Sequence, residues 1–498
     1  MMRMLKRYSD IVLYRYIVSV YCNQMDLYNK STQTSVILFA GFASYCTFEL
    51  MNYTRVCRNY DRLNQMRNRS TASRADIGVL VDRILETTPT TIQRCIEYTS
   101  TRHIDSREAL VDSLYVPEKY EEIPYTQLSA GRTKLKFVYY PLIAEIGLRT
   151  IRRLGNAHLR WIGFRRTRYP TQIGDYHVWS RIVPGTKPIV FFPGFGLGAV
   201  AYGNMLRYFR RTAYIVEIPN LGMASDAAPG FITPETVYQV VRHHLLEMES
   251  AESAESAESV ESVESVESVE SAESVESAES AESAESAESA ESAESVDCDR
   301  TTVPSHDIIA HSMGSGQAAF YVNAQYTNHT EDATQTVIIC DGFVNPYDTI
   351  SSITFSFIDS SLFNEYKHRS SWIEFMLVVN LVCTNVLCST YTKRAICLYH
   401  SVLWREDYKA NICYIYGERD LLYDVPFIAS LAANDKHPDN TMVIPRARHG
   451  ACLFGKKRNQ TLDRMIRWMD SNGRTNGRTN EMSLTICKSY RTVPPIYA

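Results

Sequence analysis

The sequence predicts an α/β fold, in which a mostly parallel central sheet is flanked by helices on both faces. Short apolar runs recur between residues 178 and 470, and segments with a helical pattern separate them. Strands that are buried on both faces appear as continuous apolar runs, and their alternation with helices is typical of parallel sheets.

The apolar runs and periodic segments define the expected elements. Strands are expected at 188–192, 212–219, 307–311, 336–340, 411–416 and 441–445. Helices are expected at 234–248, 317–325 and 459–470.

The segment Ala310–Gly316 follows the third expected strand and contains Ser312 between small residues. A serine flanked by small residues at a strand-to-helix junction has the form of a nucleophile elbow. The turn is tight, so a larger side chain beside the serine would collide with the neighbouring strand or helix. We therefore expect Ser312 to be a nucleophile.

An acid and a base follow Ser312 in the chain. Asp420 comes directly after the fifth strand, and His449 directly after the sixth. A histidine can take the serine proton near neutral pH, and a carboxylate can orient and stabilise it. Asp341, at the end of the fourth strand, and Glu418 are alternative acids.

The glycine-rich segment 193–198 follows the first strand and suggests an oxyanion hole. The expected donors are the backbone N–H groups of Phe195 and Met313. A phosphate-binding loop of the Walker type is excluded, since no Lys-Ser/Thr pair ends the segment. A plain turn is the alternative.

Together these segments resemble the α/β-hydrolase superfamily over residues 178–470, with the chain order serine, acid, histidine. One departure is Pro193, where the oxyanion loop of the family usually begins with His-Gly. The resemblance implies a serine hydrolase that cleaves a carboxylic ester, with a lipid-like ester as the expected substrate, and that needs no metal and no diffusible cofactor. A non-catalytic binding or scaffold protein and an acyltransferase are the alternatives, although the His-x-x-x-x-Asp signature of some acyltransferases is absent.

A narrower resemblance is to membrane-associated, fungal-type α/β-hydrolases. It rests on His177-Val178-Trp179, on Gly196–Tyr202 and on Ser401-Val402-Leu403-Trp404. It implies association with a membrane on its cytosolic side; a cytoplasmic location is the alternative.

The regions outside the strands divide the chain further. Residues 1–130 are expected to be a helical N-terminal region, residues 131–177 a connection and residues 471–498 a flexible tail. The hydrolase region 178–470 is interrupted by the Ala/Val-Glu-Ser repeat at 249–297 and by a helical lid insertion at 346–410. The repeat lacks an apolar stripe and has little apolar bulk, so disorder is expected.

Two apolar segments have more than one interpretation. Residues 31–48 carry no charge and could form a marginal membrane span, a helix in the membrane interface or a buried helix. Residues 372–388, inside the lid insertion, could be a fully buried helix or a lid whose apolar face meets substrate or membrane.

The net charge of −4 depends on the repeat. Without the 16 glutamates at 249–294, 52 basic residues face 40 acidic ones. This excess suits an anionic membrane surface or nucleic acid, or is an ordinary scatter of arginines on solvated faces. Of these partners we expect a membrane surface and no nucleic acid. The 12 cysteines include no Cys-x-x-Cys pair, which favours reduced thiols.

Overall fold

The computed structural model of this chain describes residues 32–65, 73–87, 106–114, 142–171, 174–194, 198–217, 234–264, 303–328, 335–342, 402–403, 411–420, 425, 428–429, 440–455 and 457–473. Two compact units make up the chain. The first comprises Met1–Arg62 and Tyr139–Gly147, and the second comprises Leu63–Val138 and Leu148–Ala498.

The first unit is built on α2 (Thr32–Gln65) and on the first residues of α6 (Leu142–Trp161). Glu145 of α6 is buried and accepts hydrogen bonds from Asn52 and Arg55 of α2, each at 2.9 Å. Glu49 of α2 accepts the backbone N–H of Leu142 at 2.8 Å. Polar contacts therefore join the two helical segments of this unit.

The apolar segment 31–48 lies largely within α2, and the large side chains described there, from Phe39 onward, are exposed. Phe39 is 54% exposed and Phe48 is 60% exposed. The expectation of a buried helix is therefore wrong for these residues. Among the described helices, none has the length and apolarity that a membrane crossing requires.

The second unit contains one sheet of eight strands in the order β1-β2-β4-β3-β5-β6-β7-β8. Their bounds are Arg165–Thr171, Gly174–Arg181, Ile189–Phe192, Ala213–Glu217, Asp307–His311, Thr336–Cys340, Asn411–Gly417 and Thr441–Ile444 for β1 to β8. β2 runs antiparallel to both of its neighbours, and β4, β3, β5, β6, β7 and β8 are parallel to one another. The predicted mostly parallel sheet is confirmed, and its six expected strands correspond to β3 to β8.

β1 and the first residues of β2 lie in the range 131–177 that we expected to be a connection. β1 is rich in arginine and contains Pro170, and β2 mixes polar and apolar residues. Charged side chains and proline in an edge strand such as β1 hinder pairing with other chains. Such a strand has no apolar run, which is the signal that predicted the other strands. The sheet consequently begins at Arg165, before the expected start of the hydrolase region.

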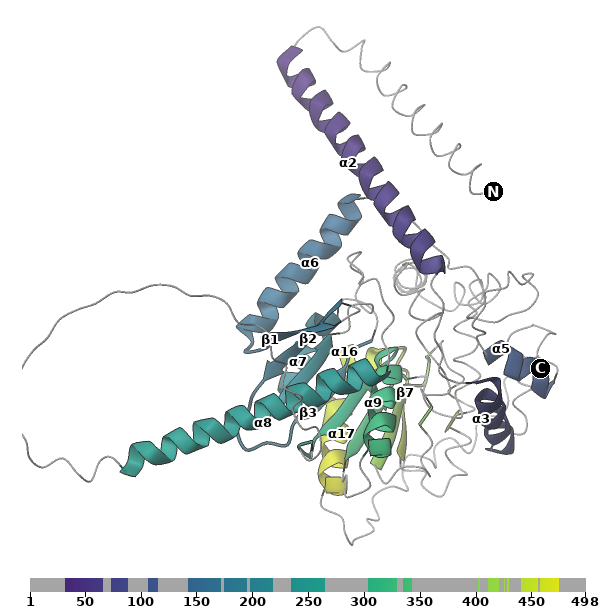
Figure 1. The fold of residues 1–498 in the computed structure, drawn as a ribbon, viewed down its shortest axis with the longest axis vertical. Helices are drawn as coiled ribbons and strands as arrows, with labels where there is room; N and C mark the ends of the chain where they lie inside the picture. Colours follow the sequence, from purple (N-terminus) through teal and green to yellow (C-terminus); the bar gives the residue numbers. More distant parts are fainter. Residues whose placement is uncertain are drawn as a thin grey trace, which may run out of the picture. The chain divides into compact units, whose positions relative to one another are not determined.

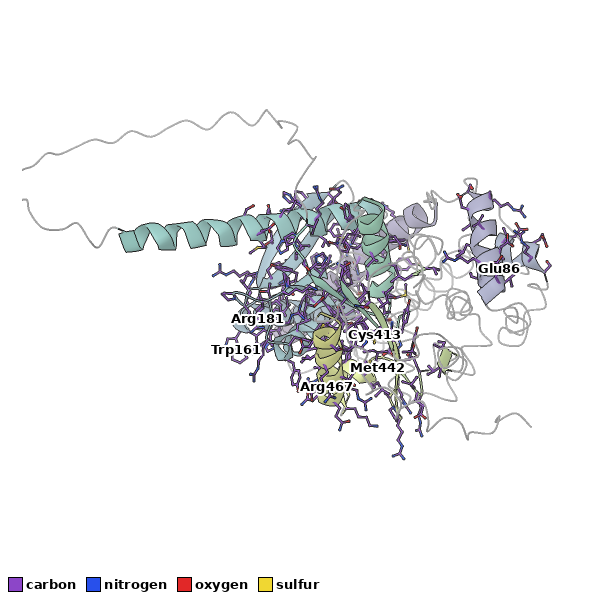
Figure 2. The ribbon with its side chains drawn as sticks, turned by 90° about the horizontal axis from the view of Figure 1, so that it is seen from below. Glu86, Trp161, Arg181, Cys413, Met442 and Arg467 are labelled. Carbon is purple, nitrogen blue, oxygen red and sulfur yellow. The ribbon has the colours of Figure 1, made fainter. Side chains whose placement is uncertain are left out.

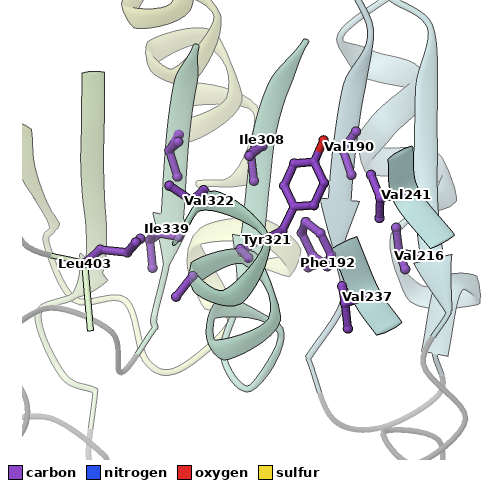
Figure 3. Close-up of a cluster of buried hydrophobic side chains, with 14 of the residues drawn as sticks. Val190, Phe192, Val216, Val237, Val241, Ile308, Tyr321, Val322, Ile339 and Leu403 are labelled. Atoms are coloured by element: carbon purple, nitrogen blue, oxygen red, sulfur yellow. The ribbon is translucent and has the colours of Figure 1, made fainter. Parts of the chain in front are cut away.

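Apolar side chains alternate between the two faces of the sheet. On one face, α8 (Pro234–Glu264) and α9 (Gly314–Asn328) cover the strands (Figure 1). Tyr321 of α9 and Val237 of α8 meet Phe192 of β3 in this layer, as Figure 3 shows. Burial on both faces explains why β3 and the central residues of β5 and β6 are continuous apolar runs.

The opposite face of the sheet packs against four helical segments. They are the C-terminal part of α6, α7 (Gly203–Tyr208), α16 (Ala451–Phe454) and α17 (Arg458–Gly473). Leu159 of α6, Leu206 of α7 and Met465 of α17 are fully buried there. A short 3-10 helix, Gly198–Ala201, precedes α7.

α8 corrects the expectation of disorder across the whole repeat. It continues to Glu264 and so includes the first Ala/Val-Glu-Ser triplets. Alanine and glutamate have good helix propensity, and extending an existing helix avoids the cost of nucleation. Residues 265–302, with the rest of the repeat, lie outside the described residues.

The expected helical region 1–130 contributes α3 (Arg74–Thr87) and α5 (Arg107–Leu114) to the second unit. Arg107 of α5 pairs with Asp82 of α3, and Leu80 and Ile84 pack with Val402. Of the expected lid insertion 346–410, only residues 402–403 are described, so the lid and its segment 372–388 lie outside the described part, as do residues 474–498.

Candidate active site

Ser312 occupies a sharp turn between β5 and α9. Its φ angle is +50°, a left-handed conformation that serine rarely adopts. A Cβ atom on Gly314 would lie 2.3 Å from the carbonyl oxygen of Phe192, so only glycine fits there. The turn leaves Ser312 partly exposed above buried residues, as the sequence pattern predicts.

The three residues expected to form a triad lie in one hydrogen-bonded row. His449 Nε2 lies 3.0 Å from Ser312 Oγ, and His449 Nδ1 lies 2.8 Å from Asp420 Oδ2. An ionised carboxylate can only accept, so Nδ1 carries the proton and Nε2 is left to accept the serine hydroxyl proton. Asp420 is buried, while Ser312 and His449 are partly exposed.

Hydrogen bonds between two loops hold Asp420 beside His449. After β7, Glu418 N–H donates to Ile444 O at 3.0 Å, and Arg419 N–H donates to Ala447 O at 2.7 Å. The loop after β7 is thus joined to the end of β8 and the loop that carries His449. Asp420 and His449 are 29 positions apart in the chain, and they meet because β7 and β8, which precede them, are adjacent parallel strands.

The alternative acids are placed differently. The side chain of Glu418 is directed to the backbone N–H of Arg446, 2.5 Å from Oε2. Asp341 is fully buried, and its carboxylate accepts the N–H groups of Gly417 at 3.0 Å and Gly450 at 2.7 Å. It thereby fixes the residue next to His449, which the sequence did not predict.

Asp341 also has an unusual protonation equilibrium. Burial, with the nearby Asp420, raises its pKa to about 6. Cys452 donates its S–H to Asp341 Oδ2 at 3.1 Å, and contact with Cys340 and burial hold the pKa of Cys452 well above its ordinary value. The thiol is therefore a proton donor here.

A second buried chain of hydrogen bonds connects the glycine loop to the serine turn. Gly194 N–H donates to Tyr202 Oη at 3.1 Å, and Tyr202 Oη lies 2.8 Å from His311 Nδ1. Burial and the adjacent His449 hold the pKa of His311 well below its ordinary value, so the ring is neutral. A Cβ on Gly194 would come within 2.9 Å of His311 Nδ1, so a glycine is needed at this contact.

The structure describes one of the two expected oxyanion donors, Met313. Met313 follows Ser312 in the turn and is buried. Phe195 lies outside the described residues. The role of both N–H groups stays a prediction.

One group of side chains in the described residues could hold a metal ion. The ligand atoms of Asp341, Asp420 and His449 lie within 4.8 Å of one another. Asp341 already accepts three donors, and both ring nitrogens of His449 have partners. A metal would have to displace these hydrogen bonds, so the arrangement suits proton transfer better than metal binding.

The strand order, the antiparallel β2 and the serine turn after β5 together define the architecture. The chain has the α/β-hydrolase fold. No protein-family model matches the sequence, and a search of curated proteins finds no match.

Solved structures to which this chain is similar include a carboxylesterase from Bacillus subtilis, at 7% sequence identity and a TM-score of 0.37. The match covers 66% of this chain and 99% of that chain. An esterase from Thermogutta terrifontis has 11% identity, 62% and 99% coverage and a TM-score of 0.36. At such low identities and TM-scores, these similarities do not indicate what this chain does.

A second serine–histidine pair lies outside this site. His244 Nε2 lies 2.8 Å from Ser180 Oγ, and Tyr169 donates its hydroxyl proton to Glu247 at 2.7 Å while its oxygen contacts His244 Nδ1 at 2.5 Å. Ser180 and His244 are both buried. The pair joins α8 to β1 and β2 and is a matched control for the site at Ser312.

Buried histidines predict that the protein loses stability in mild acid. Burial lowers the pKa of His244 and of His306 to about 4. In the unfolded chain, histidine pKa values lie near 6.5, so between about pH 6.5 and 4 the unfolded chain binds more protons than the folded protein. As the pH falls through this range, each of the two histidines therefore lowers the free energy of unfolding by up to about 3 kcal/mol. Asp341 acts in the opposite direction, since its raised pKa reduces stability as the pH rises from about 4 to 6.

Urea unfolding at a series of pH values measures this dependence. The His306→Gln variant should be less stable than wild type at neutral pH, but should lose less stability on acidification. If the free energy of unfolding of the variant and of the wild type fell equally with pH, the assignment of His306 as a buried neutral base would be contradicted.

Proposed function

We propose that the protein is a serine hydrolase that cleaves a carboxylic ester. The observation that carries the proposal is the row Ser312–His449–Asp420, with distances of 3.0 and 2.8 Å and the serine in a strained turn. A nucleophile, a base bonded to it and an acid that orients the base are the requirements for acyl transfer through serine.

In the first half-reaction, Ser312 Oγ attacks the ester carbonyl carbon while its proton moves to His449 Nε2. The carbonyl oxygen becomes an oxyanion, which the backbone N–H groups of Met313 and Phe195 would stabilise. The C–O bond to the alcohol then breaks, and the leaving oxygen takes the proton from His449. The products of this step are the free alcohol and an acyl-enzyme on Ser312.

In the second half-reaction, water attacks the acyl carbon and gives a proton to His449. The bond to Ser312 Oγ breaks, the serine recovers its proton and the carboxylic acid leaves. Asp420 stays ionised throughout and stabilises the imidazolium form of His449. One ester and one water thus give one alcohol and one acid.

Labelling the full chain with a fluorophosphonate probe tests the proposal. We expect one adduct, on the peptide that contains Ser312, and retention of that adduct in Ser180→Ala. Absence of any adduct would favour a non-catalytic protein of this fold. Ester consumption that releases no carboxylic acid when an alcohol acceptor is present would favour an acyltransferase.

The substrate and the location belong to the same proposal. It includes a lipid-like ester as substrate and a membrane-associated position facing the cytosol. The exposed Phe39, Phe42 and Phe48 of α2 support contact with a membrane. The resemblance to membrane-associated, fungal-type hydrolases agrees with this position. Fractionation of cells that express the full chain checks the location, and recovery of the protein in the cytosolic fraction alone would contradict it. Comparing the hydrolysis of short and long esters checks the substrate.

A further inference from the structure

We propose that the outer face of α6, within residues 148–161 of the second unit, docks onto an anionic lipid surface. The proposal concerns a different helix from the apolar segment of α2. It is also independent of the chemistry at Ser312, because none of the α6 residues used below belongs to the catalytic row.

The inner face of this part of α6 is already occupied. Leu159 is fully buried in the core, and a Cβ on Gly155 would lie 2.3 Å from Val200. Arg152 donates to the buried carboxylate of Glu217 at 2.8 Å. These contacts fix the orientation of the helix on the sheet and determine which residues face outward.

The outer face carries large apolar side chains. Ile151 is 48% exposed, Leu154 67% and Trp161 82%. At about 100° per residue, the three positions fall within about 80° of one another around the helix axis. Figure 2 shows Trp161 at the periphery of the side chains. An exposed apolar stripe on a helix whose other side is packed marks an interaction surface.

Charge identifies the class of partner. Residues 148–161 contain four arginines and no acidic residue. Arg153 and Arg160 are exposed and lie beside the apolar stripe, while Arg152 is paired with Glu217. A helix with a basic border, an apolar stripe and a tryptophan at one end is suited to the boundary between headgroups and acyl chains of an anionic membrane.

A membrane explains the surface better than a protein partner does. Three apolar side chains on one convex helix are a small area compared with the roughly 800 Å² per partner of a stable protein interface. Shallow insertion into a bilayer needs no such area, because basic residues add electrostatic attraction to each inserted side chain. The acidic repeat of the same chain could pair with the arginines, but its alanine and valine side chains are too small to cover Trp161.

Co-sedimentation of the full chain with vesicles tests the proposal. The probes are phosphatidylcholine vesicles with and without about one-third phosphatidylserine. We expect the Leu154→Glu variant to bind the anionic vesicles about tenfold or more weakly than wild type. The control is Val79→Glu on α3, because Val79 is 65% exposed and the same charge is introduced. Arg153→Gln with Arg160→Gln should reduce the dependence of binding on salt.

Tryptophan fluorescence ties the binding to this helix rather than to α2. Brominated acyl chains should quench part of the emission of the wild type when vesicles are added, and this part should be missing in Trp161→Phe. Equal binding of Leu154→Glu and wild type, or equal quenching of Trp161→Phe and wild type, would overturn the proposal. So would a Trp161 that acrylamide cannot reach without vesicles, since this would indicate that the acidic repeat covers it.

Hydrolysis of a water-soluble ester separates this proposal from the proposed function. Leu154→Glu should keep the wild-type rate on such an ester while it loses vesicle binding. If the wild type binds vesicles but does not hydrolyse the ester, the proposed function of Ser312 fails while the docking proposal stands.

Discussion

Replacing Ser312 with alanine should lower kcat for an activated ester by about 10⁶-fold. The change removes the atom that forms the acyl-enzyme and leaves His449 without the proton it accepts. Alanine keeps the Cβ of serine and adds no atom, so the turn at φ +50° should be kept. The measurement is steady-state hydrolysis of a p-nitrophenyl ester, with folding checked by circular dichroism.

Ser180→Ala is the matched control. It removes a hydroxyl that also contacts a histidine, at 2.8 Å from His244 Nε2, but in the buried layer between α8 and β2. We expect its kcat to stay at the wild-type value, while its free energy of unfolding falls by about 1–3 kcal/mol, because a buried acceptor loses its partner. A Ser180→Ala enzyme as inactive as Ser312→Ala would contradict the assignment of the nucleophile.

Replacing Asp420 with asparagine should lower kcat by about 10⁴-fold with little change in structure. The amide can present an N–H group to His449 Nδ1, which favours the tautomer with its proton on Nε2. That tautomer cannot accept the proton of Ser312. The pH dependence of single-turnover acylation measures the loss.

Asp341→Asn separates the roles of the two aspartates. Asp341 uses both carboxylate oxygens to accept backbone N–H groups, from Gly417 and Gly450. An asparagine would place an NH₂ group against one of these donors, so we expect a loss of about 1–3 kcal/mol in the free energy of unfolding. Its kcat should fall less than that of Asp420→Asn. The reverse order of the two kcat values would make Asp341 the acid that orients His449.

The parallel strands and the row at Ser312 were predictable from sequence because their signals are local. Each of β3, β5 and β6 is buried on both faces and therefore appears as an apolar run. Ser312 is marked by the small residues that its turn requires, and Gly314 shows why, with a backbone carbonyl 2.3 Å from any Cβ. Asp420 and His449 follow strand ends, and parallel strands bring such ends to one edge of the sheet.

The supporting residues were not predictable in the same way. Asp341 contacts Gly450 across 109 residues of sequence, and Tyr202 contacts His311 across 109 residues as well. Neither contact leaves a local pattern, because each depends on which strands are neighbours. β1 was not predicted because its arginines and Pro170 resemble a loop. The helical start of the repeat was not predicted because it continues α8, whose first part packs on the sheet.

The position of the acidic repeat has a consequence for how this gene can change. The chain returns from the repeat into β5 at Asp307, and Ser312 follows the opposite end of that strand. Each triplet is encoded by whole codons, so copies can be gained or lost without shifting the reading frame. Doubling a loop adds only about 0.6 kcal/mol to its closure cost. Copy number can therefore drift under weak selection, and related genes should differ far more in the length of the repeat than in the spacing between Ser312, Asp420 and His449.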